Sequence, residues 1–336
     1  MLKEKIVVVT QESDSHADVI ITKLKALGHE VVRFDTADIP TESLVSMGIG
    51  ASGYSARLNI PKYDLNLDFK TVKSIWWRKP RTPVLPTGLT ARENRFARQE
   101  LTTVINGLWA ALDCYWMSFP GKLREAGWKF GQLKLAAALG FDVPKTLITS
   151  DPDELRRFVK MCGGKVVFKV LSDPTLGMDM TPRLVDADEI MAAYTTLLTQ
   201  EMIEPNIEKI KKTPCQFQEY IEKKHELRIT VIGNQIFTGE IDSQKQERTK
   251  IDWRHHDVPI LLRAGHLPQP VADKCLALVK RYGLEFSAID IIVTPDDRYV
   301  FLESNPNGQW LFVEHLAPEL RMTEALIKCL TAGCSN

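Results

Sequence analysis

The sequence predicts an α/β protein that opens with parallel strands and closes with an antiparallel hairpin. Residues 5–10, KIVVVT, are a short apolar run typical of a buried strand, and residues 30–34, EVVRF, are a second. Between them, an apolar stripe at helical spacing runs from Val19 to Leu27 and stops at Gly28, a residue type that commonly ends helices. Strand, helix and strand in this order are typical of a parallel sheet. No GxGxxG follows the first strand, so this turn lacks a dinucleotide fingerprint.

The rest of the N-terminal part predicts short strands and one long helix. Short antiparallel strands are expected over residues 50–75, ending in SIWWR at residues 74–78. A long amphipathic helix is expected over residues 92–112. Residues 116–121, WMSFPG, interrupt this pattern with proline and glycine. We therefore place the first boundary there and expect an N-terminal domain over residues 1–118.

The central part alternates helical and strand patterns. Asp151 precedes Pro152 and further acidic residues, which is the pattern of a capped helix start. We expect this central domain to span residues 119–213. Its expected elements, in chain order, are a helix over residues 122–139, a strand over 143–148, a helix from 151, a strand over 166–171, and a long helix through Ala192 and Leu198.

The C-terminal part, residues 214–332, is expected to be mostly antiparallel sheet. The segment 294–298, TPDDR, is rich in turn-forming residues and separates two apolar runs, so the two runs read as a hairpin. The expected elements are strands over residues 215–221, 227–232 and 235–241, a helix over 269–283, and the hairpin strands 288–293 and 299–303.

This hairpin carries oxygen-bearing side chains that could hold a cation. Asp290 interrupts the apolar run AIDIIV, where a strand has no ordinary use for a carboxylate. Glu303 and Asn305 alternate with Ser304, so an extended chain points both side chains to one face. Two carboxylates and an amide oxygen suit a hard cation such as Mg²⁺. Taken singly, the same residues also fit a hydrogen-bonded polar group in a strand and an ordinary turn.

Two lysines are candidates for binding an anion. Lys169 alternates with Phe168 and Val170 in an apolar strand, so its ammonium faces the opposite side of the sheet. A lysine on an inner face is costly unless an anion meets it, and nucleotide phosphate is a natural partner. An outward lysine on a half-exposed strand explains the same pattern. Lys129, on an expected amphipathic helix, is the weaker candidate because a charge there is usually solvated.

The stretch QFQEYIEKKHELR, residues 216–228, joins a strand to a charged linker. Backbone groups at a strand end can read an adenine edge, and a following carboxylate can bind ribose hydroxyls. Arg228 begins the next strand, where it is either part of a structural ion pair or a clamp on phosphate oxygens. A later loop, residues 250–254, adds Arg254 after a further strand, and loops on a rigid scaffold often carry binding groups.

Composition excludes some classes of function. The 336 residues carry 43 basic and 43 acidic side chains, so no overall charge marks a nucleic-acid or membrane binder. The six cysteines are scattered without CxxC or zinc-ligand spacing, so we expect free thiols. The N-terminal apolar run is too short for the core of a signal peptide, and no window matches a membrane span. We expect a cytoplasmic protein that binds neither nucleic acid nor a membrane.

The order of these parts resembles the ATP-grasp superfamily, and within it the microviridin-type (graspetide) peptide maturases. Each motif is moderately specific, and their joint order is strongly so. The resemblance spans nearly the whole chain, from RFDT at residues 33–36 to residue 315. Its motifs are SIWWRKP at residues 74–80, HELRITVIG at 225–233, IDWR at 251–254, AID at 288–290 and ESNPNG at 303–308.

The resemblance implies an ATP-grasp fold with an N-terminal parallel α/β domain, a central α+β domain and a C-terminal antiparallel-sheet domain. It also implies a role for each candidate residue. Phosphates would meet Lys129 and Lys169, adenine would meet Glu219, Tyr220 and Ile221, and ribose would meet Glu226. Magnesium would be held by Asp290, Glu303 and Asn305, and Arg228 and Arg254 would face the γ-phosphate and the acyl phosphate.

Two departures from the family pattern stand out. Ser304 occupies a position that is often aliphatic in the family, which changes packing and not metal ligation. The span from Leu171 to Arg183 is shorter than in some relatives. The leader-peptide contacts of those relatives are therefore not transferred to this chain.

The resemblance implies an ATP-dependent ligase that forms ADP and phosphate, with ATP and Mg²⁺ as cofactors. It would activate Asp or Glu side chains of a ribosomal precursor peptide, leader and core, as acyl phosphates. Thr, Ser or Lys side chains of that peptide would then form ester or amide cross-links. One alternative is an ATP-grasp ligase that adds a free amino acid to a peptide or metabolite, and another is a non-catalytic binding module. The resemblance leaves a homodimer open.

Overall fold

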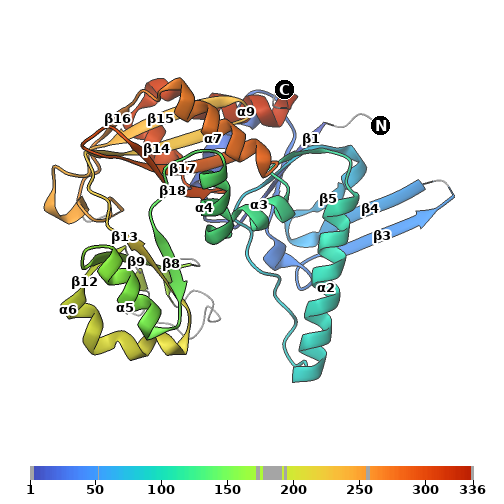
Figure 1. Cartoon of the computed structure of the whole chain (residues 1–336). Coiled ribbons are helices and arrows are strands. Elements are labelled where there is room, and N and C mark those ends of the chain that lie inside the picture. Colours follow the sequence, from blue (N-terminus) through green and yellow to red (C-terminus); the bar gives the residue numbers. More distant parts are fainter. Residues whose placement is uncertain are drawn as a thin grey trace.

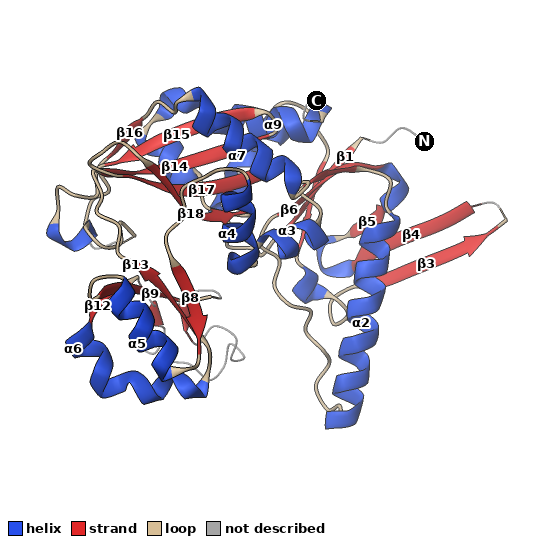
Figure 2. Ribbon diagram, viewed as in Figure 1, coloured by secondary structure: helices blue, strands red, loops and turns tan. Residues whose placement is uncertain are grey.

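The computed structural model describes residues 4–51, 53–171, 175–176, 191–192, 195–254 and 258–333. Three bodies are visible in it (Figure 1): an N-terminal one in blue, a central one in green and yellow, and a C-terminal one in orange and red. Strands form the middle of each body and helices lie against them (Figure 2). Three parts are recognisable, as expected from the sequence. The limit at residue 118 remains a prediction, whereas the central sheet continues past the expected limit at residue 213, because its strand β13 spans Cys215–Glu219.

The N-terminal body is built on a parallel sheet with the order β2-β1-β6-β7. Its strands are β1 (Lys5–Val9), β2 (Val31–Phe34), β6 (Val72–Trp77) and β7 (Tyr115–Met117). Helix α1 (Ser15–Ala26) connects the first two, and the Asp14 carboxylate caps it by accepting from the backbone N–H groups of His16 and Ala17. The expected parallel opening is confirmed. The expectation that SIWW ends an antiparallel set is wrong, because β6 pairs in parallel with β1.

A smaller antiparallel sheet projects from this body on the right of Figure 1. It contains β3 (Leu44–Gly50), β4 (Gly53–Ile60) and β5 (Leu65–Asp68). The long helix α2 (Ala91–Ala111) begins with a reciprocal capping box between Thr90 and Glu93 and buries Trp109 in the core.

The single helix expected over residues 122–139 is wrong, because the chain forms two helices there. These are α3 (Pro120–Ala126) and α4 (Lys129–Ala138). Trp128 breaks the helical path with extended dihedrals, φ −77° and ψ 104°, and serves as the N-cap position of α4. The break makes Lys129 the first residue of a helix that packs on the last strand of the C-terminal sheet.

The central body is an antiparallel sheet with the order β12-β9-β13-β8. Its strands are β8 (Thr146–Thr149), β9 (Lys165–Lys169), β12 (Thr196–Thr199) and β13 (Cys215–Glu219), with helices α5 (Pro152–Met161) and α6 (Gln200–Ile203). The capped helix start at Asp151 is confirmed. Phe158 of α5 and Phe217 of β13 lie in the same buried cluster, which fixes the helices on one face and leaves the other for the site.

The long helix expected through Ala192 and Leu198 is wrong where the chain is described. Ala192 lies in β11 (Met191–Ala192), which pairs with β10 (Thr175–Leu176), and Leu198 lies in β12 beside Val166. A short apolar run does not distinguish a strand from a helix by periodicity alone, and pairing with β9 decides it here. The remainder of that expected helix lies outside the described residues.

The C-terminal body is an antiparallel sheet with the order β16-β15-β14-β17-β18. Helix α7 and helix α4 pack on one face, while α9 packs between the other face and the N-terminal sheet. The strands expected over residues 227–232 and 235–241, the helix and the hairpin are confirmed, whereas the strand expected over 215–221 is β13 and belongs to the central sheet. The elements are β14 (His225–Ile232), β15 (Gln235–Ile241), β16 (Leu262–Ala264), α7 (Gln269–Arg281), β17 (Phe286–Val293), β18 (Tyr299–Asn305), α8 (Leu311–Leu316) and α9 (Met322–Ala332).

Two smaller expectations concern thiols and membranes. The expectation of free thiols holds for Cys114, Cys162, Cys215 and Cys275. It is wrong for Cys329, which is disulfide-bonded. Among the described helices, none combines the length and the apolar character that crossing a bilayer requires.

Candidate active site

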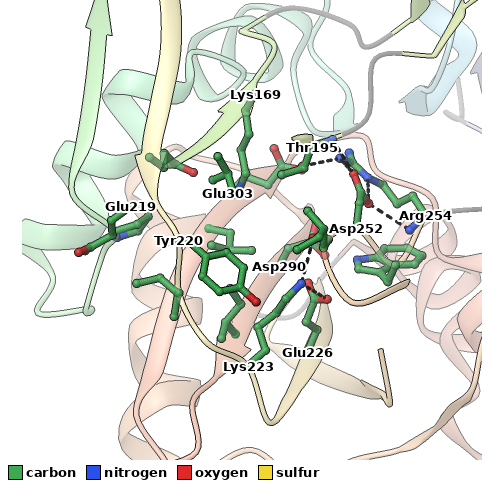
Figure 3. Close-up of a pocket in the computed structure, with 18 of the residues that line it drawn as sticks. Lys169, Thr195, Glu219, Tyr220, Lys223, Glu226, Asp252, Arg254, Asp290 and Glu303 are labelled. Atoms are coloured by element: carbon green, nitrogen blue, oxygen red, sulfur yellow. Dashed lines mark hydrogen bonds and ion pairs between the residues drawn. The ribbon is translucent and has the colours of Figure 1, made fainter. Parts of the chain in front are cut away.

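A pocket of about 880 Å³ lies between the central and C-terminal sheets. Figure 3 shows its charged side chains converging from both sheets and from the loop that carries Arg254. β9 and β13 provide one wall, and β14, β17 and β18 provide the other. A second cavity of about 1730 Å³ adjoins it. Residues shared by both linings are Lys129, Trp253, Arg254, Asp290 and Glu303.

Lys169 ends β9 and points toward Glu303 in Figure 3. Its ammonium makes no hydrogen bond or ion pair with any residue in the described part of the chain. Burial is the main cause that lowers the pKa of Lys169, and the nearby cations Lys129 and Arg254 lower it further, against the opposing effect of Glu303. Because this ammonium points into the pocket and lies near other cations, an anion would bind favourably beside it.

Glu303 is the carboxylate around which these cations gather. Its side chain accepts a short hydrogen bond from the Lys129 ammonium, which α4 places across from β18. Burial alone would raise the pKa of Glu303, but Lys129, Arg254 and Lys169 together outweigh burial and hold this pKa well below its ordinary value. Glu303 is therefore ionised at neutral pH.

Asp290 is held by Arg228 from the neighbouring strand. Arg228 Nη1 donates to both carboxylate oxygens of Asp290 at 2.9 Å, and Arg228 Nη2 donates to the carbonyl of Gln309 at 2.9 Å. Burial raises the pKa of Asp290, and Arg228 opposes that rise. Gly308 permits this packing, because a Cβ there would lie 2.9 Å from Arg228 Nη2 and 2.7 Å from the Cβ of Ala288.

Asn305 links the two carboxylates. Its Nδ2 lies 3.2 Å from Asp290 Oδ2 and 3.1 Å from Glu303 Oε1, so one amide group reaches both acids. Rotating the Asn305 amide about its last side-chain bond would direct its oxygen, in place of Nδ2, toward a cation between the two carboxylates. No three His, Cys, Asp or Glu side chains gather as a metal site in the described ranges. Mg²⁺ commonly takes one or two carboxylates together with substrate phosphates, so these residues fit it.

Arg254 is oriented by Asp252 and Thr195. Arg254 Nε and Nη2 donate to the two oxygens of Asp252 at 2.8 and 2.7 Å, while the Thr195 backbone N–H donates to the same carboxylate at 2.9 Å. Burial would raise the pKa of Asp252, but the hydrogen bonds and charge of Arg254 hold it well below its ordinary value. The guanidinium is thereby fixed at the junction of the two cavities.

The segment after β13 lines the other end of the pocket. The Glu219 side chain points away from the pocket in Figure 3 and accepts from the Lys145 backbone N–H and ammonium at 2.7 and 2.8 Å. Only the backbone of Glu219 is therefore available to a ligand. Tyr220 and Ile221 line the pocket. Glu226 is buried and accepts from the Lys223 ammonium at 2.8 Å, which also donates to the Ile251 carbonyl at 3.0 Å.

All the residues singled out in the sequence line one or both cavities. Arg228 and Asn305 lie at the second cavity and the remaining candidates at the first. The sequence reasoning assigned no role to Lys223, Asp252, Thr195 or Gln132. Asp252 had a detectable signal, an acid two residues before an arginine in a loop. Thr195 and Gln132 had none, because their contacts depend on distant segments.

The comparisons with known proteins agree with this architecture. The model of the MvdD pre-ATP grasp domain matches residues 5–123. The chain is similar to the macrocyclase MdnC of Microcystis aeruginosa MRC, solved with precursor peptide MdnA, at 31% identity and a TM-score of 0.82, covering 97% of this chain and 98% of MdnC. The chain belongs to the MvdD/MdnC family of ATP-grasp macrocyclases. The ATP-grasp fold expected from the sequence is confirmed.

Further structures extend the likeness of this ATP-grasp ligase. A RiPP-associated ATP-grasp ligase of Chryseobacterium gregarium, solved with ADP and a leader and core peptide, is 27% identical with a TM-score of 0.84, covering 97% and 96% of the two chains. The ATP-grasp ligase PsnB, solved with a phosphomimetic variant of minimal precursor, Mg and ADP, is 23% identical with a TM-score of 0.75 over 100% of both chains, and shows the fold alone. No curated protein matches the chain.

Proposed function

We propose that this ligase uses ATP and Mg²⁺ to join side chains within a ribosomal precursor peptide. Asp or Glu carboxylates of the peptide core are activated as acyl phosphates, and Thr or Ser hydroxyls, or Lys amines, of the same peptide then form ester or amide bonds. The MdnC and Chryseobacterium gregarium structures, which contain precursor peptides, support this substrate class. We also place the enzyme in the cytoplasm; the four free thiols among the described residues support this, and the disulfide of Cys329 opposes it.

The nucleotide is assigned to the pocket between the two sheets. Lys169 and Lys129 bind its phosphates, the backbone of Glu219 with Tyr220 and Ile221 meets adenine, and Glu226 takes the ribose hydroxyls. The Lys169 ammonium has no partner among the described residues, and the Glu219 side chain points away from the pocket; both observations support this orientation. The buried Glu226 carboxylate is held in place by Lys223, which supports a fixed acceptor there.

Asp290, Glu303 and Asn305 would hold Mg²⁺, which supplies charge neutralisation to the phosphate oxygens. Lys129 forms an ion pair with Glu303, and Arg228 forms one with Asp290. Lys129 lowers the pKa of Glu303, and Arg228 fixes the position of the Asp290 carboxylate. Arg228 and Arg254 face the second cavity, where the peptide carboxylate would enter.

The reaction divides into two transfers. A carboxylate oxygen of the peptide attacks the γ-phosphorus of ATP, the bond to the β-phosphate oxygen breaks, and ADP leaves. A hydroxyl or amine then attacks the acyl carbon, loses its proton, and expels inorganic phosphate. Arg254 and Arg228 stabilise charge on the transferring phosphoryl group, which is the main catalytic task in such reactions. The net change in the peptide is the loss of one water per bond.

A single observation carries this proposal. Lys169, Lys129 and Arg254 surround Glu303, and Lys169 has no anionic partner of its own among the described residues. The Lys169 ammonium therefore lies in the first cavity without an anion to neutralise it among the described residues, beside the residues that both cavities share. A polyanionic ligand such as a nucleotide triphosphate meets that requirement.

Trapping with hydroxylamine tests the proposal. The purified protein is incubated with ATP, Mg²⁺, hydroxylamine and the peptide encoded by any small reading frame that adjoins its gene and is rich in Thr and in Asp or Glu. We expect hydroxamates at Asp or Glu residues of the peptide, formed only with ATP. Absence of hydroxamate, while ATP is consumed, would contradict acyl phosphate formation. Joining of a free amino acid, the alternative reaction, would instead raise the mass of the acceptor.

A further inference from the structure

Gln132 lies outside the residues that the sequence indicates, yet it contacts the strand that carries the candidate metal ligands. It is one helical turn after Lys129 on α4 and is 2% exposed. Its side chain faces β18 at Ser304, between Glu303 and Asn305. A buried glutamine requires partners for both ends of its amide.

The amide of Gln132 satisfies both backbone groups of one residue. Its Nε2 donates to the Ser304 carbonyl at 2.7 Å, and its Oε1 accepts from the Ser304 N–H at 2.9 Å. Nε2 also donates to the Ala126 carbonyl at the end of α3. β18 is the edge strand of its sheet, so among the described residues no further strand pairs with the N–H and carbonyl of Ser304. Gln132 supplies the hydrogen bonds that a neighbouring strand would otherwise make.

The pairing of β18 with β17 is irregular at this point. Asp290 pairs with Glu303, whereas the next residue, Ile291, pairs with Phe301, so Leu302 is an extra residue in the ladder. A bulge changes the direction of the side chains around it, and the ladder alone therefore fixes their position less strictly. The bonds of Gln132 to Ser304 fix the strand immediately beyond the bulge.

The Ser304 side chain strengthens the same attachment. Its hydroxyl lies 2.6 Å from that of Ser287 on β17, and both serines are buried. Ser304 is thus held through its N–H, its carbonyl and its side chain. Because side chains alternate along a strand, this places Glu303 and Asn305 together on the pocket face.

We infer that Gln132 is a positioning residue for Glu303 and Asn305. It joins α4 to the edge of the C-terminal sheet and sets the direction of both side chains toward the metal and nucleotide. The inference rests on the proposed function, in that it takes Glu303 and Asn305 to bind Mg²⁺. It adds that α4 contributes twice to the site, through the charge of Lys129 and through the amide of Gln132.

The test measures how strongly Mg²⁺ enhances ADP binding. The Kd of ADP is determined by calorimetry in EDTA and in Mg²⁺ for the wild type, Gln132→Leu and Gln132→Glu. Gln132→Leu introduces an apolar side chain of similar size that forms none of these hydrogen bonds, and Gln132→Glu keeps only the acceptor. Ser74→Ala is the matched control, because Ser74 Oγ donates to the Leu330 carbonyl at 2.7 Å and is likewise buried, away from the pocket.

We expect the Mg²⁺ enhancement to fall by about tenfold or more in both Gln132 variants, as for residues that orient metal ligands, and to persist in Ser74→Ala. If Gln132→Leu does not fold, Gln132→Glu alone decides the result. Wild-type enhancement in a folded Gln132 variant would overturn the inference. A wild type in which Mg²⁺ gives no enhancement would instead refute the proposed metal site itself, so the two failures are distinguishable.

Discussion

Arg228 and Asp290 are direct partners across strands β14 and β17, and the guanidinium donates to both carboxylate oxygens. The pair is almost completely buried. Burial raises the pKa of Asp290, so its ionised state depends on the adjacent Arg228. Arg228 also holds the loop after β18 through the Gln309 carbonyl. One arginine therefore controls the charge of a candidate metal ligand and the position of the loop beside it.

Replacing Arg228 should affect both stability and turnover. In Arg228→Met, the uncompensated Asp290 should lower the free energy of unfolding by about 3 to 5 kcal/mol. Loss of a phosphate-facing donor should also reduce ATP turnover by about 100-fold or more. Urea denaturation and a coupled ADP assay measure the two effects. Arg263→Met, at an exposed pair with Glu240, is the control and should change neither appreciably.

The double variant separates the two roles of Arg228. Adding Asp290→Asn removes the buried charge, so much of the lost stability should return while turnover stays low. If Arg228→Met alone retained wild-type turnover, the assigned role of Arg228 at the phosphoryl group would be wrong.

Lys169 should stabilise the bound nucleotide and destabilise the empty protein. Burial lowers its pKa, which means that the folded protein disfavours the charged form. Lys169→Met should therefore raise the free energy of unfolding without ligand, by on the order of 1 kcal/mol, and abolish the increase in Tm caused by ADP. Thermal melts with and without ADP test this. Lys165→Met, at the exposed start of the same strand, should keep the ADP effect, and an undiminished effect in Lys169→Met would contradict the assignment.

Strand pairing could be predicted from the sequence where the order of apolar runs and turns determines which two strands are neighbours. The hairpin of β17 and β18 follows from two apolar runs around a turn, and hairpin partners are sequence neighbours. The partner of β6 could not be read from SIWW, because an apolar strand looks the same in a parallel and an antiparallel sheet. The break at Trp128 could not be predicted either, because apolar residues follow helical spacing both before and after it.

The site was predictable where the residue type is unusual for its surroundings. Asp290 in an Ile-rich strand and Lys169 in a Val-rich strand both indicated function because burial makes an isolated charge costly. Gln132 gave no such signal, since a glutamine is ordinary in an amphipathic helix. Its importance arises only when α4 packs against Ser304, a contact between residues far apart in the chain.

Asp252 should act through the orientation of Arg254. Asp252→Asn keeps the shape of the side chain and removes its negative charge. The amide N–H₂ of the asparagine would then face the Arg254 N–H groups, which in the wild type donate to a carboxylate oxygen. We expect kcat to fall by about 100-fold with little change in the KM of ATP, because a small displacement of a catalytic group is costly. Glu247→Gln, at the exposed pair with Lys250, is the control. An unchanged kcat in Asp252→Asn would show that Arg254 is oriented by other contacts.

His16 should make stability depend on pH. Burial and the neighbouring Arg78 lower the pKa of His16 from 6.5 to about 4, and its ring packs against Trp310. Between these values the unfolded chain binds the proton that the folded protein excludes. The free energy of unfolding should therefore decrease as pH falls from 6.5 to 4, by on the order of 3 kcal/mol.

Denaturation curves at several pH values measure this effect. His16→Gln should remove most of that pH dependence, whereas His266→Gln, at an exposed histidine, should leave it in place. An identical pH dependence in wild type and His16→Gln would assign the effect to other groups.

Intact-mass spectrometry of a precursor peptide, encoded by any small adjacent reading frame rich in Thr and in Asp or Glu, tests the central claim most directly. After incubation with the protein, ATP and Mg²⁺, we predict that the peptide loses the mass of one water for each bond formed, and that Glu303→Gln abolishes the loss. A peptide whose mass is unchanged, or increases, while the wild-type protein is folded and binds ADP would contradict the claim.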